Sequence, residues 1–354
     1  MKIKEFQKYL KKKRISSAIF FNKGLDVIEP NFYYFARSNF PFCLVIPSAK
    51  KPALFVSKMD AEAARKAVKG MRLVKVGKHF FPHLKKYAKG TKIGIDKHSL
   101  TLAMFSRLKK ELKKKRFVDV SAACLELRAI KTKEEINIIK KGCRISDEIL
   151  KSCFRNFRSF RTEQDVTSFL ETETIKRGCE LAFKPVVASG KHSSMPHHIP
   201  QDKKLGRGFC VIDFGIKYKS YCTDTTRTIC IGKLSKTEIK LYNLLLNAQQ
   251  NTIKSIKPGM RCSETWETCT KNLGEYKKAM IHGLGHGVGV EIHELPNLKQ
   301  ASKDALKEGM VFTIEPGIYF EGRFGIRIED TILMAKKPVL LTKIPKHLLI
   351  MRER

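Results

Sequence analysis

Residues 211–232 read VIDFGIKYKSYCTDTTRTICIG and place two aspartates, Asp213 and Asp224, within apolar, strand-like sequence. The two residues are symmetric about the Tyr218–Lys219 step. A β-hairpin that turns at this step would bring them opposite one another, roughly 5 Å apart at Cβ. The segment therefore predicts two carboxylates on one face of a hairpin.

Residues 311–334, VFTIEPGIYFEGRFGIRIEDTILM, repeat the arrangement with glutamates. Glu315 and Glu329 are symmetric about Gly322, which lies in the turn-like sequence EGR. We therefore expect a second hairpin that also carries two opposed carboxylates on one face.

Four carboxylates in apolar surroundings need a compensating charge. Like charges at this spacing repel one another, and burial adds a desolvation cost. A bound cation would offset both effects. The alternative is that all four acids lie on exposed faces of amphipathic strands, which explains one acid more easily than four. The two hairpins therefore predict a carboxylate-rich metal site.

A glycine-rich segment at residues 282–296, HGLGHGVGVEIHELP, supplies His282, His286 and His293. Its alternating glycines exclude a stable helix, and with it a helical HExxH zinc motif. Four carboxylates and one imidazole form a ligand set that suits Mn²⁺, Co²⁺ or Fe²⁺ better than a structural zinc. Five such ligands, two of them bridging, could hold two ions ~3.5–4 Å apart.

Three further residues are weaker candidates. His197, in the loop sequence SGKHSSMPHHIPQD, is by itself more typical of a surface histidine than of a catalytic one. Arg327 lies two positions before Glu329, on the same strand face, where it could orient the acids. Its alternative is an ordinary surface arginine. Cys222 is best interpreted as a packed thiol.

The pattern of elements divides the chain of 354 residues in two. Residues 1–122 alternate helix-like and strand-like segments, which predicts an α/β domain. Within it, NFYYFAR at residues 31–37 is predicted as a strand because of its aromatic content. Residues 123–354 begin with two helices and continue as an α+β domain that holds all the candidate site residues.

The net charge of +36 indicates attraction to polyanions, and nucleic-acid binding is one interpretation of it. The basic residues are spread along the chain, and no recognised nucleic-acid motif accompanies them. We therefore favour solvated lysine-rich surfaces and expect no specific nucleic-acid partner.

The chain shows the features of a cytosolic protein. Its ten cysteines include no CxxC pair, which argues against a zinc ribbon, and a disulfide framework is not expected in a chain of this length. No apolar stretch approaches ~18 residues, so we expect no membrane partner. The lysine-rich start is not followed by the apolar region of a signal peptide. We expect a cytoplasmic location.

Taken together, the stretches SGxxxxMPHH, VIDFGxxYxxYCTDTTRTI, HGLGHGVGVEIHELP, FTIEPGIYF and GIRIEDTIL resemble the two-metal pita-bread metallopeptidases. The resemblance is to their Xaa-Pro branch, the prolidases and Xaa-Pro aminopeptidases (aminopeptidases P), and it covers nearly the whole chain. It implies a creatinase-like α/β domain at residues 1–122 and a pita-bread (creatinase/aminopeptidase-like) α+β catalytic domain at residues 123–354.

The resemblance also implies a role for each candidate residue. The metal ligands would be the four acids and one histidine, namely Asp213, Asp224, His286, Glu315 and Glu329. Glu315 would also act as general base. His197 would interact with the scissile nitrogen and His293 with the carbonyl oxygen. His282 would line the substrate pocket. Asp224 and Glu329 would bridge the two ions, and Arg327 would support these bridging acids.

The implied activity is metal-dependent hydrolysis of Xaa-Pro bonds in proline-containing peptides, of the prolidase (Xaa-Pro dipeptidase) type. An aminopeptidase P acting on longer peptides shares every ligand and remains the alternative. A non-catalytic binding protein on the same fold is a distant one, because no ligand is missing. The resemblance further implies two divalent ions per subunit, Mn or Co before Zn or Fe, and a homodimer.

Overall fold

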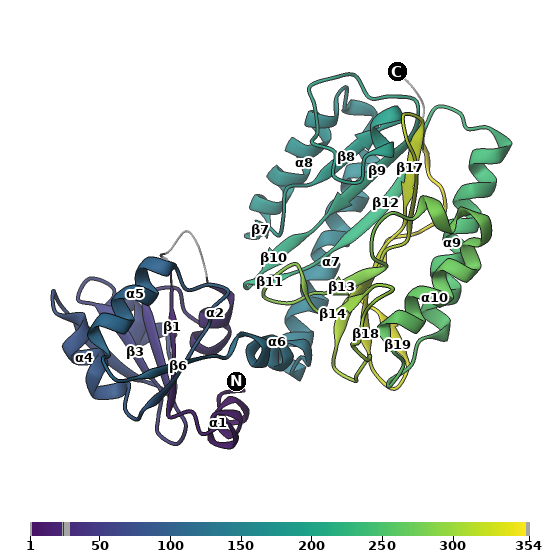
Figure 1. Cartoon of the computed structure of the whole chain (residues 1–354). Helices are drawn as coiled ribbons and strands as arrows, with labels where there is room; N and C mark the ends of the chain where they lie inside the picture. The colour runs from purple at the N-terminus through teal and green to yellow at the C-terminus, as the bar shows by residue number, and fades with distance from the viewer. Residues whose placement is uncertain (1, 23, 25–28, 352–354) are drawn as a thin grey trace. The chain divides into compact units, whose positions relative to one another are not determined.

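The chain folds into two units, Met1–Arg128 and Ala129–Arg354 (Figure 1). The computed structural model describes residues 2–22, 24 and 29–351. Among these residues, no helix combines the length and the apolar character needed to span a bilayer. The α/β unit followed by an α+β unit confirms the predicted fold class.

The first unit is built on one six-stranded sheet with the order β4-β3-β2-β1-β5-β6. Its strands are β1 (Ser17–Phe21), β2 (Cys43–Pro47), β3 (Ala53–Ser57), β4 (Arg72–Val76), β5 (Lys92–Ile95) and β6 (Arg116–Asp119). Of these six, only β2 runs opposite to the others. Its helices are α1 (Ile3–Lys12), α2 (Pro30–Ala36), α3 (Ala61–Ala67), α4 (Phe80–Tyr87), α5 (Leu102–Glu111) and α6 (Ser121–Ala129).

One predicted strand in this unit is wrong: residues 31–37 lie in and just after helix α2. Pro30 occupies the first helical turn, where its fixed φ favours helix and its missing N–H costs nothing. Phe32 and Phe35 are both fully buried and lie three residues apart, which is the spacing of one helix face. Their burial together with this start outweighs the strand preference of aromatic residues.

The second unit contains two pairs of helices and several short sheets. The helices are α7 (Lys133–Arg155), α8 (Glu163–Lys176), α9 (Lys236–Ser255) and α10 (Cys262–Leu273). The strands are β7 (Glu180–Leu181), β8 (Val186–Ser189), β9 (Gly208–Phe214), β10 (Ile216–Tyr218), β11 (Tyr221–Cys222), β12 (Thr225–Ile231), β13 (Gly285–Gly287), β14 (Glu294–Leu298), β15 (Val311–Ile314), β16 (Gly317–Phe320), β17 (Phe324–Arg327), β18 (Asp330–Met334), β19 (Pro338–Leu340) and β20 (Ile350–Met351).

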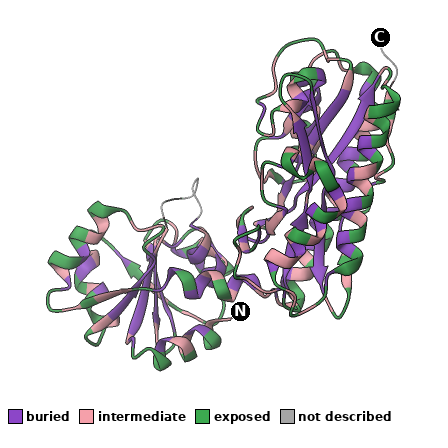
Figure 2. Cartoon of the chain, turned by 45° about the vertical axis from the view of Figure 1, so that its right-hand side comes forward, coloured by how far each residue is buried: buried purple, intermediate pink, exposed green. Residues whose placement is uncertain are grey.

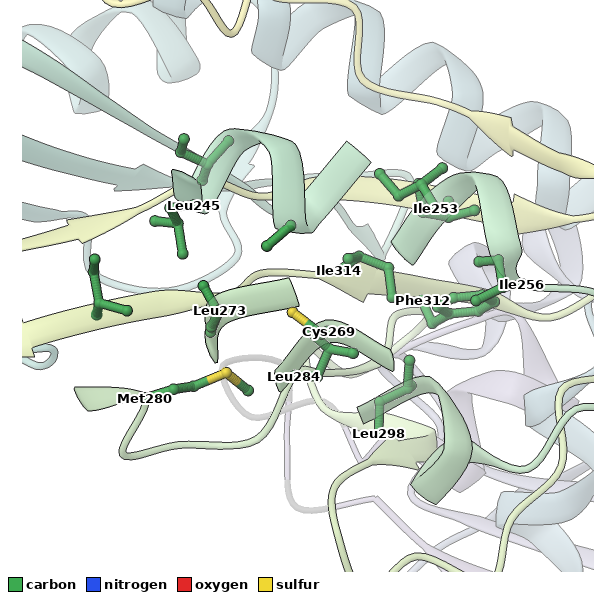
Figure 3. Packing of buried hydrophobic residues seen from close by; sticks show 14 of the residues in the cluster. Leu245, Ile253, Ile256, Cys269, Leu273, Met280, Leu284, Leu298, Phe312 and Ile314 are labelled. Carbon is green, nitrogen blue, oxygen red and sulfur yellow. The ribbon is translucent and has the colours of Figure 1, made fainter. Parts of the chain in front are cut away.

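Each helix pair covers a different group of strands. Apolar residues of α7 and α8 pack with those of β8, β9 and β12. Apolar residues of α9 and α10, such as Leu245 and Leu273, share a core with Phe312 and Ile314 of β15 (Figure 3). In both groups the strands are largely buried and the helices are exposed on their outer sides (Figure 2). Two packed layers of this kind hold the strands that carry the acids.

Candidate metal centre

The first hairpin forms, but one residue later than predicted. Its turn lies at Lys219 and Ser220, which both have positive φ, at 47° and 62°. Two such residues match the twist of the flanking strands. Asp213 therefore pairs with Thr226, and direct opposition to Asp224 is wrong. Because the shift is two positions in register, Asp213 and Asp224 still lie on one face as diagonal neighbours.

The second hairpin confirms the predicted register. Ile314 pairs with Asp330 on one side of the acids, and Gly317 pairs with Arg327 on the other. Both pairs of strands have the same register, and continuing it through the short gap between the two pairs places Glu315 across from Glu329.

His286 enters from β13, where glycines allow close backbone packing. A Cβ atom on Gly285 would lie 2.1 Å from the carbonyl oxygen of Thr313. The ring Nδ1 of His286 lies 3.1 Å from the carbonyl oxygen of Gly287. An N–H at Nδ1 that donates to this carbonyl leaves the Nε2 lone pair free to act as a metal ligand.

The Nε2 atom of His286 points at the acids. It lies 3.3 Å from Glu315 Oε1 and 3.5 Å from Asp224 Oδ2. Burial lowers the pKa of His286, which favours the neutral ring. A neutral nitrogen lone pair facing two carboxylate oxygens is repulsive unless a cation lies between them, so the geometry fits a metal ligand.

The carboxylates also fit a bound cation. Among the described residues, buried oxygens without a hydrogen-bond partner include Asp213 Oδ1, Asp224 Oδ1 and Glu329 Oε1. Burial raises the pKa of Asp224 well above its usual range, and the charges of Glu329 and Asp213 raise it further. Burial likewise raises the pKa of Glu329 and of Glu315. Ligand atoms of Asp224, His286 and Glu329 all lie within 4.8 Å of one another. Unpaired oxygens that converge with an imidazole are the donor set that a divalent metal requires.

Arg327 is buried behind the acids and holds two of them in place. Its guanidinium donates to Asp213 Oδ2 at 2.7 Å, to the Tyr319 hydroxyl at 2.7 Å and to Thr226 Oγ1 at 3.1 Å. Thr226 in turn donates to Glu329 Oε2 at 2.7 Å. Burial alone would lower the pKa of Arg327, but the neighbouring Tyr319 hydroxyl and Asp213 carboxylate raise it overall. The arginine therefore contacts Asp213 directly and Glu329 through Thr226.

A second buried network lies beside this one and has no counterpart in the sequence analysis. Asp330 accepts hydrogen bonds from Arg227 at 2.8 Å, Lys346 at 2.5 Å and Gln249 at 2.9 Å. Burial alone would raise the pKa of Asp330, but the two cations lower it. Successive strand residues point to opposite faces. Glu329 therefore faces the other acids and His286, whereas Asp330 faces the network of Arg227, Lys346 and Gln249.

Most of the predicted site residues line one cavity of about 530 Å³. Its wall includes Asp213, Asp224, His286, Glu315, Arg327, His197, His282 and His293. Glu329 does not line the cavity and lies buried beside Asp224 and His286. His282 Nε2 lies 3.1 Å from the Tyr319 hydroxyl, and the ring of His293 stands 4.2 Å from that of His286. Burial lowers the pKa of both His282 and His293.

The loop that carries His197 is held by Glu163, a residue that the sequence analysis did not identify. Its buried carboxylate accepts hydrogen bonds from the Ser189 N–H at 2.8 Å, His192 Nδ1 at 2.9 Å and His198 Nε2 at 2.7 Å. Burial alone would raise the pKa of Glu163, but these hydrogen bonds lower it overall. The position of Glu163 at the first turn of α8 was visible in the sequence, whereas its partners 26 to 35 residues away were not.

Known proteins share this architecture. A model of metallopeptidase family M24 matches residues 137–336, and one of the Creatinase/Prolidase N-terminal domain matches residues 2–130. The chain is 36% identical to an Xaa-Pro dipeptidase of Pyrococcus furiosus, over 90% of this chain and 92% of that protein.

Solved structures agree with this match. An Xaa-Pro dipeptidase from Bacillus anthracis aligns with a TM-score of 0.91 at 30% identity, covering 99% of both chains. An X-Pro aminopeptidase from Thermotoga maritima aligns with a TM-score of 0.89 at 29% identity, covering 96% of this chain and 98% of that one.

Proposed function

The chain belongs to metallopeptidase family M24, and from this membership we propose that it is an Xaa-Pro dipeptidase with a two-metal centre. The observation that carries the proposal is the group of buried, unpaired carboxylate oxygens that lie with His286 at one cavity. The match to the Pyrococcus furiosus Xaa-Pro dipeptidase, which covers 92% of that protein, supports the substrate class.

Five residues would hold the two ions, namely Asp213, Asp224, His286, Glu315 and Glu329. When bound, divalent ions would supply Lewis acidity that polarises the scissile carbonyl and makes water nucleophilic near neutral pH. Arg327 and Thr226 would keep Asp213 and Glu329 oriented, since each donates a hydrogen bond to one carboxylate oxygen and leaves the other free.

The remaining polar residues of the cavity would act on the substrate. Glu315, whose pKa is raised by burial, would accept a proton as general base. His293 would donate a hydrogen bond to the carbonyl oxygen as negative charge develops there. His197 would interact with the departing nitrogen of proline, and His282 would contact the bound peptide. An Xaa-Pro bond has no N–H, so a site that does not depend on this donor is required.

Paired assays of Ala-Pro and Ala-Pro-Ala with Mn²⁺ or Co²⁺ test the proposal. We expect the dipeptide to be cleaved with the higher kcat/KM. Preference for the tripeptide would establish the second candidate, an Xaa-Pro aminopeptidase, which the likeness to the Thermotoga maritima structure favours. Hydrolysis of neither peptide by the metal-loaded protein would contradict both.

Three finer features belong to the same proposal. We propose Mn or Co as the native metal because the ligands are four carboxylates and one imidazole. We propose a cytoplasmic location, which the ten buried cysteine thiols support. A homodimer is proposed from family resemblance alone, and sedimentation equilibrium of the purified chain tests it.

A further inference from the structure

The positive charge of the chain is concentrated in the first unit. Residues 1–128 contain 31 Lys and Arg against 9 Asp and Glu, a net charge of +22. The other 226 residues carry the remaining +14. More than half of the charge thus lies on little more than a third of the chain, in the unit that does not contain the candidate metal ligands.

A cavity of about 650 Å³ opens at one edge of the sheet in this unit. It is lined by residues that follow the carboxyl ends of three parallel strands: Asn22 after β1, Lys78 after β4 and Ser99 after β5. From β1 the chain proceeds outward to β4 on one side of the sheet and then returns to place β5 and β6 on the other. Ligand sites of open α/β sheets occur at such a reversal of strand order.

The cavity combines flat apolar surfaces with positive charge. The half-buried rings of Phe21 and Phe42 meet Phe80 edge to face, with centroids 6.1 Å and 5.1 Å apart. Lys78 is exposed on the same wall, and the guanidinium of Arg107 lies 4.8 Å from the centre of the Phe81 ring. A ligand that suits this wall has an aromatic ring and an anionic group.

A second hollow, of about 610 Å³, adjoins the first through a shared residue, Glu111. Its wall contains four lysines, namely Lys85, Lys110, Lys113 and Lys115. Glu111 pairs with Lys85 at 3.2 Å, which leaves an excess of cations in this hollow. A ligand that extends from the first hollow, lined by aromatic rings, into the second, lined by lysines, would match the lysines best if it carried several negative charges in series.

We propose that the first unit binds single-stranded nucleic acid, with a base in the aromatic hollow and successive phosphates beside the lysines. Single strands offer unpaired bases for stacking and a regular series of phosphates, whereas a duplex hides its bases. We expected no specific nucleic-acid partner because basic residues are spread along the chain, but their excess in the first unit favours one.

Fluorescence anisotropy of the full chain with labelled dT12 and rU12 tests the proposal, and the two oligomers distinguish DNA from RNA. The variant Lys110→Glu/Lys113→Glu should weaken binding about tenfold or more and reduce the salt slope by about 1.4, since each contact contributes about 0.7 for single strands. Phe80→Leu should weaken oligomer binding about fivefold or more through lost stacking while leaving inorganic polyphosphate binding unchanged.

The control is Lys236→Glu/Lys240→Glu, which makes the same charge change at exposed lysines of the second unit. An equal loss of binding in this control would overturn the site, because net charge alone would then explain the binding. Equal weakening of polyphosphate and oligomer by Phe80→Leu would overturn the aromatic part, as would displacement of dT12 by an equal concentration of AMP. Calorimetric melting establishes that each variant is folded, and Phe42→Leu replaces Phe80→Leu if the latter is not.

Discussion

Asp224→Asn should stabilise the metal-free protein and destabilise the metal-loaded one. Asp224 is buried, its Oδ1 has no hydrogen-bond partner, and the nearby acids raise its pKa. The asparagine keeps the shape, removes one negative charge and adds an amide donor. Relief of an unsatisfied buried group is worth about 1–3 kcal/mol. For a unit of this size that corresponds to a rise in Tm of roughly 2–12 °C.

When metal is added, the wild type should become more stable than Asp224→Asn. Free metal at 1,000 times its Kd stabilises a folded protein by about 4.1 kcal/mol per site, and the variant should lose most of this gain. Differential scanning calorimetry of both proteins, dialysed against chelator and then reloaded with Mn²⁺, measures both effects. Asp202→Asn is the matched control, because Asp202 is an exposed aspartate of the same unit. A metal-free variant no more stable than wild type, with its stabilisation by metal intact, would contradict the placement of Asp224 in a metal centre.

Three further predictions concern the same centre. The pKa values of Asp224 and Glu329 are raised in the folded metal-free chain, so above pH ~4 the folded chain binds more protons than the unfolded chain. The contribution of these two acids to stability is therefore present below that pH and is lost as pH rises. The Tm advantage of metal-free Asp224→Asn over wild type should therefore widen from pH 5 to pH 8, and a constant difference would contradict the assignment. Arg327→Lys keeps the charge but loses the fork of donors, which should cost about 1–3 kcal/mol in urea unfolding and lower kcat, whereas unchanged stability would exclude its positioning role. His197→Ala should lower kcat about 100-fold or more with unchanged metal content, and loss of metal instead would identify it as a ligand.

The sequence predicted the parts of the centre that local pattern encodes. Acids within apolar strands indicated both hairpins, and the second has the predicted register because Gly322 sits at its turn with φ 65°. The first hairpin was placed one residue early, since Lys219 and Ser220 are not residues that favour positive φ. Its acids share a face all the same, because a shift of two in register preserves the side.

The sequence did not predict contacts between distant segments. Nothing near Glu163 indicates that His192 and His198 meet it, and as loop residues these histidines are ordinarily exposed. Arg227 likewise lies on an apolar strand without a visible partner, because Asp330 is 103 residues away. Helix α2 was missed for a related reason, since burial of its aromatic residues decides its conformation and propensity does not.

Anomalous diffraction from crystals of the Mn²⁺-loaded chain is the most direct test of the two-metal centre. We expect two peaks about 3.5–4 Å apart, enclosed by Asp213, Asp224, His286, Glu315 and Glu329, and their loss in Asp224→Asn. Peaks located elsewhere, or a single peak that persists in the variant, would contradict a two-metal centre at these residues.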